Sequence, residues 1–261
     1  MRQTDLCRPG ILAEVFAQPL LSKGRSKTAL LSLPGEDNQF LLRNLKRGGL
    51  LGRYLDRLGI SLRRSKEEIR INLALHLKGA PVPEPALILI ERGKGGAIGT
   101  VYIEESLDGL AFLENDLPWI TKSQSIRLFA QAIRKFHDVG GRHPDLQLKN
   151  LLIAFSPKPQ AYVIDLDKAR LGNPPTVRRR AKELMRLYRS LGKRNALHLI
   201  GREGIAIFVS EYCRSFDPQE SRNLRKKLWQ ELLRAWRGVR LHALFYPDGM
   251  TSVKLPPRRF R

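Results

Sequence analysis

Short apolar runs separated by turn residues predict a small antiparallel sheet in the first hundred residues. We expect β-strands at residues 28–33, 39–43, 86–90 and 100–103, preceded by a further strand at Leu20 and Leu21. Prolines and glycines supply turns at residues 34–38 and 94–96. Residues 65–77 are predicted to form a helix, because Ser65 followed by Glu68 matches a capping box at a helix N-terminus. The first part of the chain is therefore predicted to be a sheet with one helix.

The pattern of the remaining chain is mostly helical. The apolar residues of an amphipathic helix at residues 123–137 lie on one side: Ile126, Phe129, Ala130, Ile133 and Phe136. Three further helices are expected at residues 177–191, 195–213 and 221–242. His137 is interpreted as a structural residue rather than a ligand. Four residues recur at helical spacing and are interpreted as core: Trp229, Leu232, Leu233 and Trp236. At 261 residues, the chain is predicted to be an α+β protein of one large domain or two small lobes around a cleft.

A hairpin within the helical part carries the main candidate chemistry. An apolar run at residues 151–155 and a β-prone run at residues 161–164 flank a turn with two prolines. Antiparallel strands would bring their outer ends together, and these ends carry Asn150 and Asp165. An amide oxygen and a carboxylate placed together suit Mg²⁺. Asp145 stands at the spacing from Asn150 that is typical of a kinase catalytic loop, and we expect it to accept a proton from a hydroxyl.

The alternative interpretation is that Asp145 and Asn150 are only turn residues and that Asp165 only caps the end of a strand. It is disfavoured because their spacing, their order and the flanking strands agree. In the first part of the chain, Gly24 stands in a turn that would either lie across phosphates or close an ordinary hairpin. Strand alternation puts Arg43 on the face opposite Phe40 and Leu42, where it could pair with phosphates; Lys46 is the alternative cation.

Glu68 has two interpretations. It would either reach back to the helix cap or form an ion pair with Arg43, and the second is favoured by the rest of the pattern. Residues 104–106 form a candidate hinge, where backbone groups near Glu105 would hold adenine.

The charge of the chain narrows the class of partner. The formal net charge is +22, from 47 Lys and Arg against 25 Asp and Glu. Residues 168–194 carry ten of these cations and a single acid, Glu183. Such a field favours nucleic acid, a membrane surface or an anionic lipid as the partner, and the alternative is a solvated helical face.

The two cysteines, Cys7 and Cys213, indicate no disulfide framework, which favours a reducing compartment. We expect neither a signal peptide at residues 1–16 nor a run long enough to span a membrane.

Several segments between about residues 20 and 172 resemble the lipopolysaccharide kinase family, in particular kinases of 3-deoxy-D-manno-octulosonic acid (Kdo). The resemblance rests on Lys23-Gly24-Arg25, Phe40 to Arg43, Arg47-Gly48-Gly49-Leu50, Glu68, Phe136 to Gly140, His143 to Asn150 and Val163 to Arg170. It implies a protein-kinase-like two-lobe fold, with a small antiparallel β N-lobe at residues 1–105 and a mainly helical C-lobe at residues 106–261. It also implies ATP and Mg²⁺ as cofactors, and transfer of the γ-phosphoryl group to a sugar hydroxyl of the lipopolysaccharide inner core.

The acceptor implied is Kdo on lipid A, with heptose as an alternative, at the cytoplasmic face of the bacterial inner membrane. Carried over by position, Asp145 is the catalytic base and Asn150 and Asp165 are metal ligands. Arg43 pairs with phosphates and Glu68 is its partner. Gly24 lies above the phosphates, Asp167 is a second acidic support, and Lys168 contacts a substrate phosphate or carboxylate.

Three departures separate the chain from protein kinases. Arg43 stands where they carry lysine, and Pro144 replaces the arginine that reads a phosphorylated activation loop. Only about a dozen residues separate Asp165 from the basic cluster at Arg178, which leaves no room for a peptide platform. A small-molecule or glycolipid acceptor is therefore favoured. The rival hypotheses are a small atypical kinase or ATPase acting with RNA or tRNA, and a catalytically silent kinase-like binding scaffold.

Overall fold

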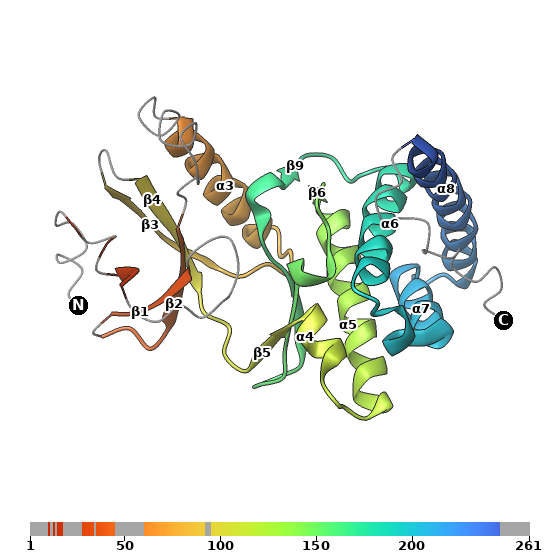
Figure 1. Cartoon of the computed structure of the whole chain (residues 1–261), viewed down its shortest axis with the longest axis horizontal. Coiled ribbons are helices and arrows are strands. Elements are labelled where there is room, and N and C mark those ends of the chain that lie inside the picture. Colours follow the sequence, from red (N-terminus) through yellow and green to blue (C-terminus); the bar gives the residue numbers. More distant parts are fainter. Residues whose placement is uncertain are drawn as a thin grey trace. The chain divides into compact units, whose positions relative to one another are not determined.

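The computed structural model describes residues 28–33, 35–44, 60–91 and 95–245, together with residues 10, 13 and 15–17. Contacts between residues divide the chain into two compact units. The first unit comprises Met1–Leu77 and Val82–Ile103, and the second comprises Lys78–Pro81 and Glu104–Arg261. In the first unit most described residues belong to one sheet and one helix, whereas the second is mainly helical (Figure 1).

The described part of the first unit contains a four-stranded antiparallel sheet with one helix against it. The strand order is β1-β2-β4-β3, and the strands are β1 (Thr28–Ser32), β2 (Gln39–Asn44), β3 (Pro85–Glu91) and β4 (Gly95–Val101). Helix α3 (Ile60–Leu77) packs against β3 and β4 (Figure 1). Phe40 and Leu42 of β2 are buried with Ala29, whereas Leu41 and Arg43 are only partly buried. The alternation predicted for this strand is therefore confirmed.

Two predicted boundaries in this unit are wrong. Helix α3 begins at Ile60, so Ser65 lies within the helix and is not its N-cap. Strand β4 begins at Gly95 rather than Thr100, because the glycines taken as turn residues are strand residues. At Gly99 an added Cβ would come within 2.8 Å of the Leu87 side chain, so glycine here allows close packing between β3 and β4. The strand predicted at residues 20–21 lies outside the described residues.

The second unit combines two small sheets with five α-helices among the described residues. β5 (Ser106–Asp108), β7 (Leu151–Ala154) and β8 (Gln160–Val163) form one antiparallel sheet, and β6 (Gly141–Arg142) pairs with β9 (Arg170–Leu171). The helices are α4 (Gly109–Glu114), α5 (Trp119–Asp138), α6 (Val177–Lys193), α7 (Leu197–Tyr212) and α8 (Pro218–Phe245). Helix α5 packs against α7, and α6 packs against α8 (Figure 1). Two short 3₁₀ helices, Leu148–Asn150 and Leu166–Lys168, also belong to the described part of this unit.

The helices predicted for this unit are present, each longer or shorter than predicted by a few residues. The apolar side of α5 is buried as expected, with Ile133 and Phe136 almost inaccessible. On α8 the core prediction holds for Leu232, but its fully buried companion is Leu228, while both tryptophans are partly exposed. Among the residues that the structure describes, no helix combines the length and the apolar character needed to cross a bilayer.

Candidate active site

Two segments of the second unit are joined at both ends by strand pairs. Residues 143–150 connect β6 to β7, and residues 164–169 connect β8 to β9. Leu151 pairs with Val163 at one end of the two segments, and Arg142 pairs with Arg170 at the other. The two segments therefore run side by side over a short distance. They carry Asp145, Asn150 and Asp165, which are far apart in the chain but are brought to one place by this topology.

Gly140 makes the β6–β9 pairing possible. Its φ of +94° lies in the region that disfavours other residues, and an added Cβ would come within 1.8 Å of the Gly172 carbonyl oxygen. The Gly172 N–H donates to the Gly140 carbonyl oxygen at 3.1 Å. The glycine thus lets the chain leave α5 and approach the end of β9 closely.

Hydrogen bonds across the two segments fix their relative position. The Asn150 side-chain amide donates to the Asp145 carbonyl oxygen at 2.8 Å, and the Ile164 N–H donates to the Asn150 carbonyl oxygen at 2.9 Å. His143 Nε2 donates to the Ile164 carbonyl oxygen at 3.1 Å. Since the nitrogen of the Asn150 side chain is used as a donor, its oxygen is the atom suited to a cation. Asp165 follows directly, exposed and in left-handed backbone conformation.

Asn150 and Asp165 provide only two candidate ligand side chains for a cation. In the described part of the chain, no group of three or more His, Cys, Asp or Glu side chains is arranged to hold a metal ion. An amide oxygen and a carboxylate nevertheless fit Mg²⁺, which retains several waters and is usually shared with substrate phosphates. The chemistry of Asn150 and Asp165 therefore fits the cation that the sequence predicted.

Asp145 is an ionised, accessible carboxylate. Its side chain is 41% exposed, Gln147 Nε2 donates to Oδ1 at 2.8 Å, and Lys168 Nζ lies 3.5 Å from Oδ2. The hydrogen bond from Gln147 lowers the pKa of Asp145 below its ordinary value, the positive charge of Lys168 lowers it further, and partial burial opposes both. Asp145 is thus deprotonated at neutral pH, as a proton acceptor must be. The sequence identified Asp145 and Lys168 but not Gln147.

A buried acid on α6 holds the loop at residues 143–150 in place. Glu183 accepts a hydrogen bond from the His143 backbone N–H at 2.8 Å and another from His137 Nε2 at 3.2 Å. The Tyr212 hydroxyl donates to His137 Nδ1 at 2.7 Å. Burial lowers the pKa of His137, so its imidazole is neutral. Burial alone would raise the pKa of Glu183, but the hydrogen bonds from His137 and His143 hold it below its ordinary value. The structural interpretation of His137 is confirmed.

A second contact from α6 holds the other end of the loop. Ser190 Oγ accepts a hydrogen bond from the Leu148 N–H at 2.9 Å and donates to the Leu187 carbonyl oxygen at 2.7 Å. Ser190 and Glu183 are seven residues apart, which is about two helical turns, so they lie on the same face of α6. Neither residue was recognised from the sequence. The available signal was that Glu183 is the single acid in a strongly basic stretch.

In the first unit, Arg43 at the end of β2 forms an ion pair with Glu68 of α3. Their side chains are 26% and 9% exposed. Of the two interpretations of Glu68, the ion pair is the one present, and the reach back to a cap at Ser65 is wrong because α3 starts earlier. Gly24 and Lys46 lie outside the described residues. Glu105 is exposed with a φ of +45° in the turn before β5, and Asp167 lies in the second 3₁₀ helix.

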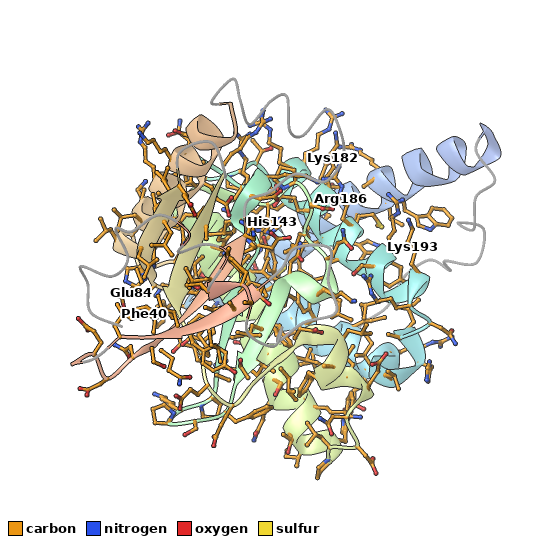
Figure 2. The ribbon with its side chains drawn as sticks, turned by 60° about the vertical axis from the view of Figure 1, so that its left-hand side comes forward. Phe40, Glu84, His143, Lys182, Arg186 and Lys193 are labelled. Atoms are coloured by element: carbon orange, nitrogen blue, oxygen red, sulfur yellow. The ribbon has the colours of Figure 1, made fainter. Side chains whose placement is uncertain are left out.

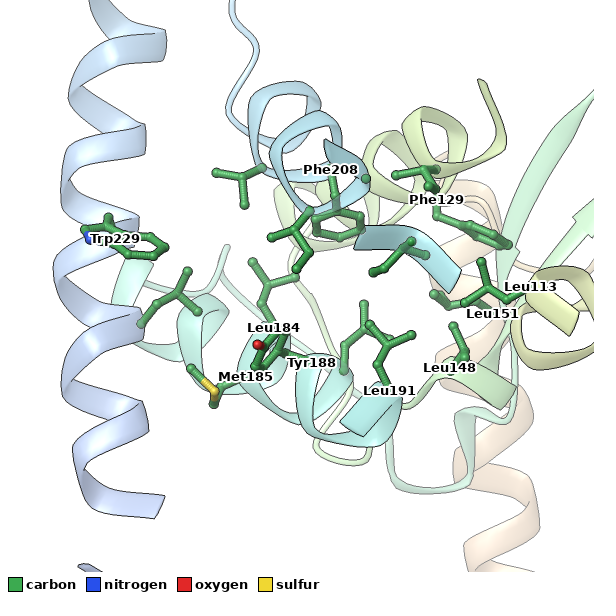
Figure 3. A pocket seen from close by; sticks show the side chains of 17 residues that line it. Leu113, Phe129, Leu148, Leu151, Leu184, Met185, Tyr188, Leu191, Phe208 and Trp229 are labelled. Atoms are coloured by element: carbon green, nitrogen blue, oxygen red, sulfur yellow. The ribbon is translucent and has the colours of Figure 1, made fainter. Parts of the chain in front are cut away.

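The helical unit also contains an apolar cavity of about 100 Å³ (Figure 3). Side chains from α4 to α8 and from the start of β7 line it, including Leu113, Phe129, Leu184, Phe208 and Trp229. Leu148 and Leu151 also line it, so the cavity lies directly behind the segment that carries Asn150.

An α+β fold that brings the ionised carboxylate of Asp145 to the same place as Asn150 and Asp165 has the groups expected of a protein-kinase-like phosphotransferase. The model of the lipopolysaccharide kinase (Kdo/WaaP) family matches residues 22–236. The chain belongs to this family, as its resemblance at the level of sequence motifs predicted.

Individual relatives agree with this assignment. The chain is 36% identical over 163 residues to the 3-deoxy-D-manno-octulosonic acid kinase of Haemophilus influenzae, a match covering 58% of this chain and 65% of the relative. It is 32% identical over 158 residues to that of Xylella fastidiosa, covering 59% and 61%. For the kinase of Xanthomonas oryzae pv. oryzae, the identity is 31% over 183 residues, covering 68% and 70%. The first two matches thus span less than two thirds of those relatives.

A solved structure shows the same fold. WaaP in complex with acyl carrier protein aligns with a TM-score of 0.55 at 20% identity, over 87% of this chain and 92% of WaaP. The predicted protein-kinase-like α+β fold is therefore confirmed.

Proposed function

We propose that this protein is an ATP-dependent kinase that transfers the γ-phosphoryl group to a sugar hydroxyl of the lipopolysaccharide inner core. Kdo is the proposed acceptor, with a heptose as the alternative. One observation carries the proposal: the paired segments hold the ionised carboxylate of Asp145 beside Asn150 and Asp165. Membership of the lipopolysaccharide kinase family and the names of the relatives support the choice of a sugar acceptor.

Each site residue has a proposed role. Asp145 accepts the proton of the attacking hydroxyl, and Lys168 helps to keep it ionised. Asn150 and Asp165 would hold Mg²⁺, which supplies charge neutralisation on the nucleotide phosphates when bound. Arg43, oriented by Glu68, pairs with those phosphates in place of the lysine of protein kinases.

The remaining site predictions stay proposals. Gly24 would lie above the phosphates, the backbone near Glu105 would contact adenine, and Asp167 would support the acidic site. ATP and Mg²⁺ are the proposed cofactors.

We place the enzyme at the cytoplasmic face of the inner membrane as a peripheral protein. Its partner there is an anionic surface, because each Lys or Arg near such a membrane contributes roughly 1 kcal/mol of attraction. The net charge of +22 provides many such groups. Nucleic acid is the less favoured partner for the same charge.

A protein partner is proposed as well, since WaaP was solved in complex with acyl carrier protein. The apolar cavity behind the loop is suited to an acyl chain, because almost only aliphatic and aromatic side chains line it (Figure 3). Binding of acylated carrier protein to Val209→Phe, which enlarges a side chain that lines the cavity, should be weaker than binding to the parent protein when urea denaturation shows that both are folded. Equal binding by both would refute a role for the cavity.

The central experiment incubates the full chain with ATP, Mg²⁺ and a Kdo-bearing lipid A precursor, and measures the mass of the product. A gain of one phosphate is expected on the Kdo acceptor. Asp145→Asn should reduce the rate at least about a hundredfold, because a positioned general base contributes that much or more. Asp116→Asn, an exposed aspartate of the same unit, is the matched control and should retain the parent rate.

Three outcomes would contradict parts of the proposal. Undiminished transfer by Asp145→Asn would remove the proposed base. Transfer only to an acceptor that carries heptose would replace Kdo as the acceptor. Absence of transfer to either, combined with tRNA binding that weakens steeply as salt rises, would favour the RNA-linked alternative.

A further inference from the structure

A polar pocket of about 170 Å³ lies between α6 and the loop that carries Asp145. Six residues line it: Asp145, Gln147, Arg186, Arg189, Ser190 and Lys193. Three of these are cationic, and the only anionic one is Asp145 itself. The pocket is distinct from the apolar cavity in Figure 3 and contains neither Asn150 nor Asp165.

The cations are placed by the sequence of α6. Arg186, Arg189 and Lys193 follow one another at intervals of three and four residues, so they project from one side of the helix. Figure 2 shows Arg186 and Lys193 along this helix, with Lys182 about one turn before Arg186. Arg186 and Lys193 are exposed, and Arg189 is half-buried.

This side of the helix is fixed relative to the loop. The Ser190 hydroxyl, which also lines the pocket, accepts from the Leu148 N–H, and Glu183 accepts from the His143 N–H. Because these buried contacts hold the loop at two points along α6, the neighbouring cations keep a set position with respect to Asp145. A basic face that only improves solubility would need no such attachment. Burial lowers the pKa of Arg189, and the like charge of the nearby Arg186 lowers it further. An anion bound between them would relieve the repulsion between these like charges.

We propose that this pocket is an anion subsite for the acceptor, in which Arg186, Arg189 and Lys193 bind a carboxylate or phosphate group of the sugar lipid. The inference rests on the proposed kinase function and identifies the part of the acceptor that is recognised. Guanidinium groups bind carboxylates and phosphates through paired hydrogen bonds. Since Asp145 lines the same pocket, an acceptor anchored there by its anion presents a neighbouring hydroxyl to the base. The proposed Mg²⁺ ligands lie outside the pocket, which leaves it to the acceptor rather than to the nucleotide.

Steady-state kinetics with a water-soluble, delipidated acceptor tests this role without a contribution from membrane attraction. Arg186→Gln and Lys193→Gln should each raise the KM for the acceptor about tenfold, as expected for loss of one charge-assisted contact, and leave the KM for ATP unchanged. Lys182→Gln removes the same charge from the same helix but does not line the pocket, so it should behave as the parent protein. An equal effect of all three variants, or a rise in the KM for ATP instead, would overturn the proposal.

Two chemically altered acceptors identify the source of the anion. If the carboxylate is bound, reducing it to an alcohol should abolish the difference between Arg186→Gln and the parent protein. If a phosphate is bound, dephosphorylation should do so. A difference that persists with both altered acceptors would show that the anion is not part of the acceptor, and would overturn the proposal.

A binding measurement separates this inference from the proposed function. Inorganic phosphate and free Kdo are titrated into the parent protein, Arg186→Gln and Lys182→Gln, and binding is followed by NMR. Selective loss of binding in Arg186→Gln, in a protein that transfers no phosphate, would retain the subsite and reject the kinase function. Active transfer with the same anion affinity in all three proteins would retain the kinase function and reject the subsite.

Discussion

In each unit of the molecule a buried glutamate joins two elements, and Glu68 and Glu183 are held in different ways. Glu68 in the first unit is 8% exposed and pairs with the guanidinium of Arg43. Glu183 in the second unit is 6% exposed and accepts hydrogen bonds from a neutral imidazole and from the backbone N–H of His143. The first contact joins two side chains that can each change orientation, whereas the second fixes the main chain of the loop itself.

This difference separates two kinds of support for a site. In the first contact Glu68 faces a guanidinium, a group that can also bind a ligand anion. Glu183 has no such cation in its hydrogen bonds, so its burial depends on complete pairing with donors. We therefore expect loss of Glu183 to be more costly than loss of the Arg43–Glu68 interaction, and to affect stability and catalysis together.

The largest effect is predicted for Glu183→Ala. The change leaves the His143 N–H and His137 Nε2 without their acceptor in a buried position, which should lower the free energy of unfolding by about 3 kcal/mol. Urea denaturation measures this loss. Phosphotransfer should also fall in the folded protein, because His143 precedes Asp145 in the same loop.

Two variants test whether the loss of stability and rate in Glu183→Ala is specific to the contacts of Glu183. Glu203→Ala removes an exposed glutamate from α7 and should change the free energy of unfolding by less than about 0.5 kcal/mol. Glu183→Gln keeps one oxygen acceptor and should recover part of both stability and rate. If Glu183→Ala unfolds like Glu203→Ala, the support assigned to Glu183 is wrong.

The comparison also shows what could be predicted from the sequence. The hairpin that carries Asn150 and Asp165 was predictable because strands and turn are adjacent in the chain. Arg43 was placed by simple alternation along a strand. Glu183 was not recognised because its partners His137 and His143 are 46 and 40 residues away, and no local pattern encodes that contact.

The prediction of where α3 begins was wrong for a related reason. Ser65 and Glu68 match a capping box, but the same residue types are also tolerated inside helices, and the contact with Arg43 accounts for Glu68 instead. The pocket beside Asp145 was likewise missed, since its cations were recognised only as part of a basic stretch. Local chemistry was therefore predictable, and contacts made by tertiary packing were not.

An intermediate effect is predicted for the pair in the first unit. A double-mutant cycle of Arg43→Ala and Glu68→Ala should give a coupling of about 1–2 kcal/mol in the free energy of unfolding, because the pair is only partly exposed. The exposed pair Glu67–Arg70, 3.5 Å apart on the same helix, is the matched control and should give at most about 0.5 kcal/mol. Equal coupling in both cycles would contradict the special status of Arg43 and Glu68.

The smallest effect is a dependence of stability on pH. We expect it from the contact between His137 and Glu183 in the second unit and not from the Arg43–Glu68 ion pair in the first. The pKa of His137 in the folded protein lies below its ordinary value, because the ring is buried. As the pH falls below about 6.5, the unfolded chain binds a proton at His137 before the folded protein does. Stability is therefore fully present above that pH and is lost on acidification, by at most about 1.4 kcal/mol per pH unit.

Glu183 acts in the same direction at lower pH, since its pKa is also lowered in the folded protein and its contribution is lost only when acid protonates it. Measurements of the free energy of unfolding between pH 7.5 and about 5.5 therefore report mainly on histidine. His137→Gln should flatten the dependence in this range, whereas His198→Gln, which removes an exposed histidine of α7, should leave it unchanged. An unchanged slope in His137→Gln would show that the neutral imidazole beside Glu183 is not what acid disrupts. It would also show that the Glu183 contact and the Arg43–Glu68 ion pair do not differ in their response to acid.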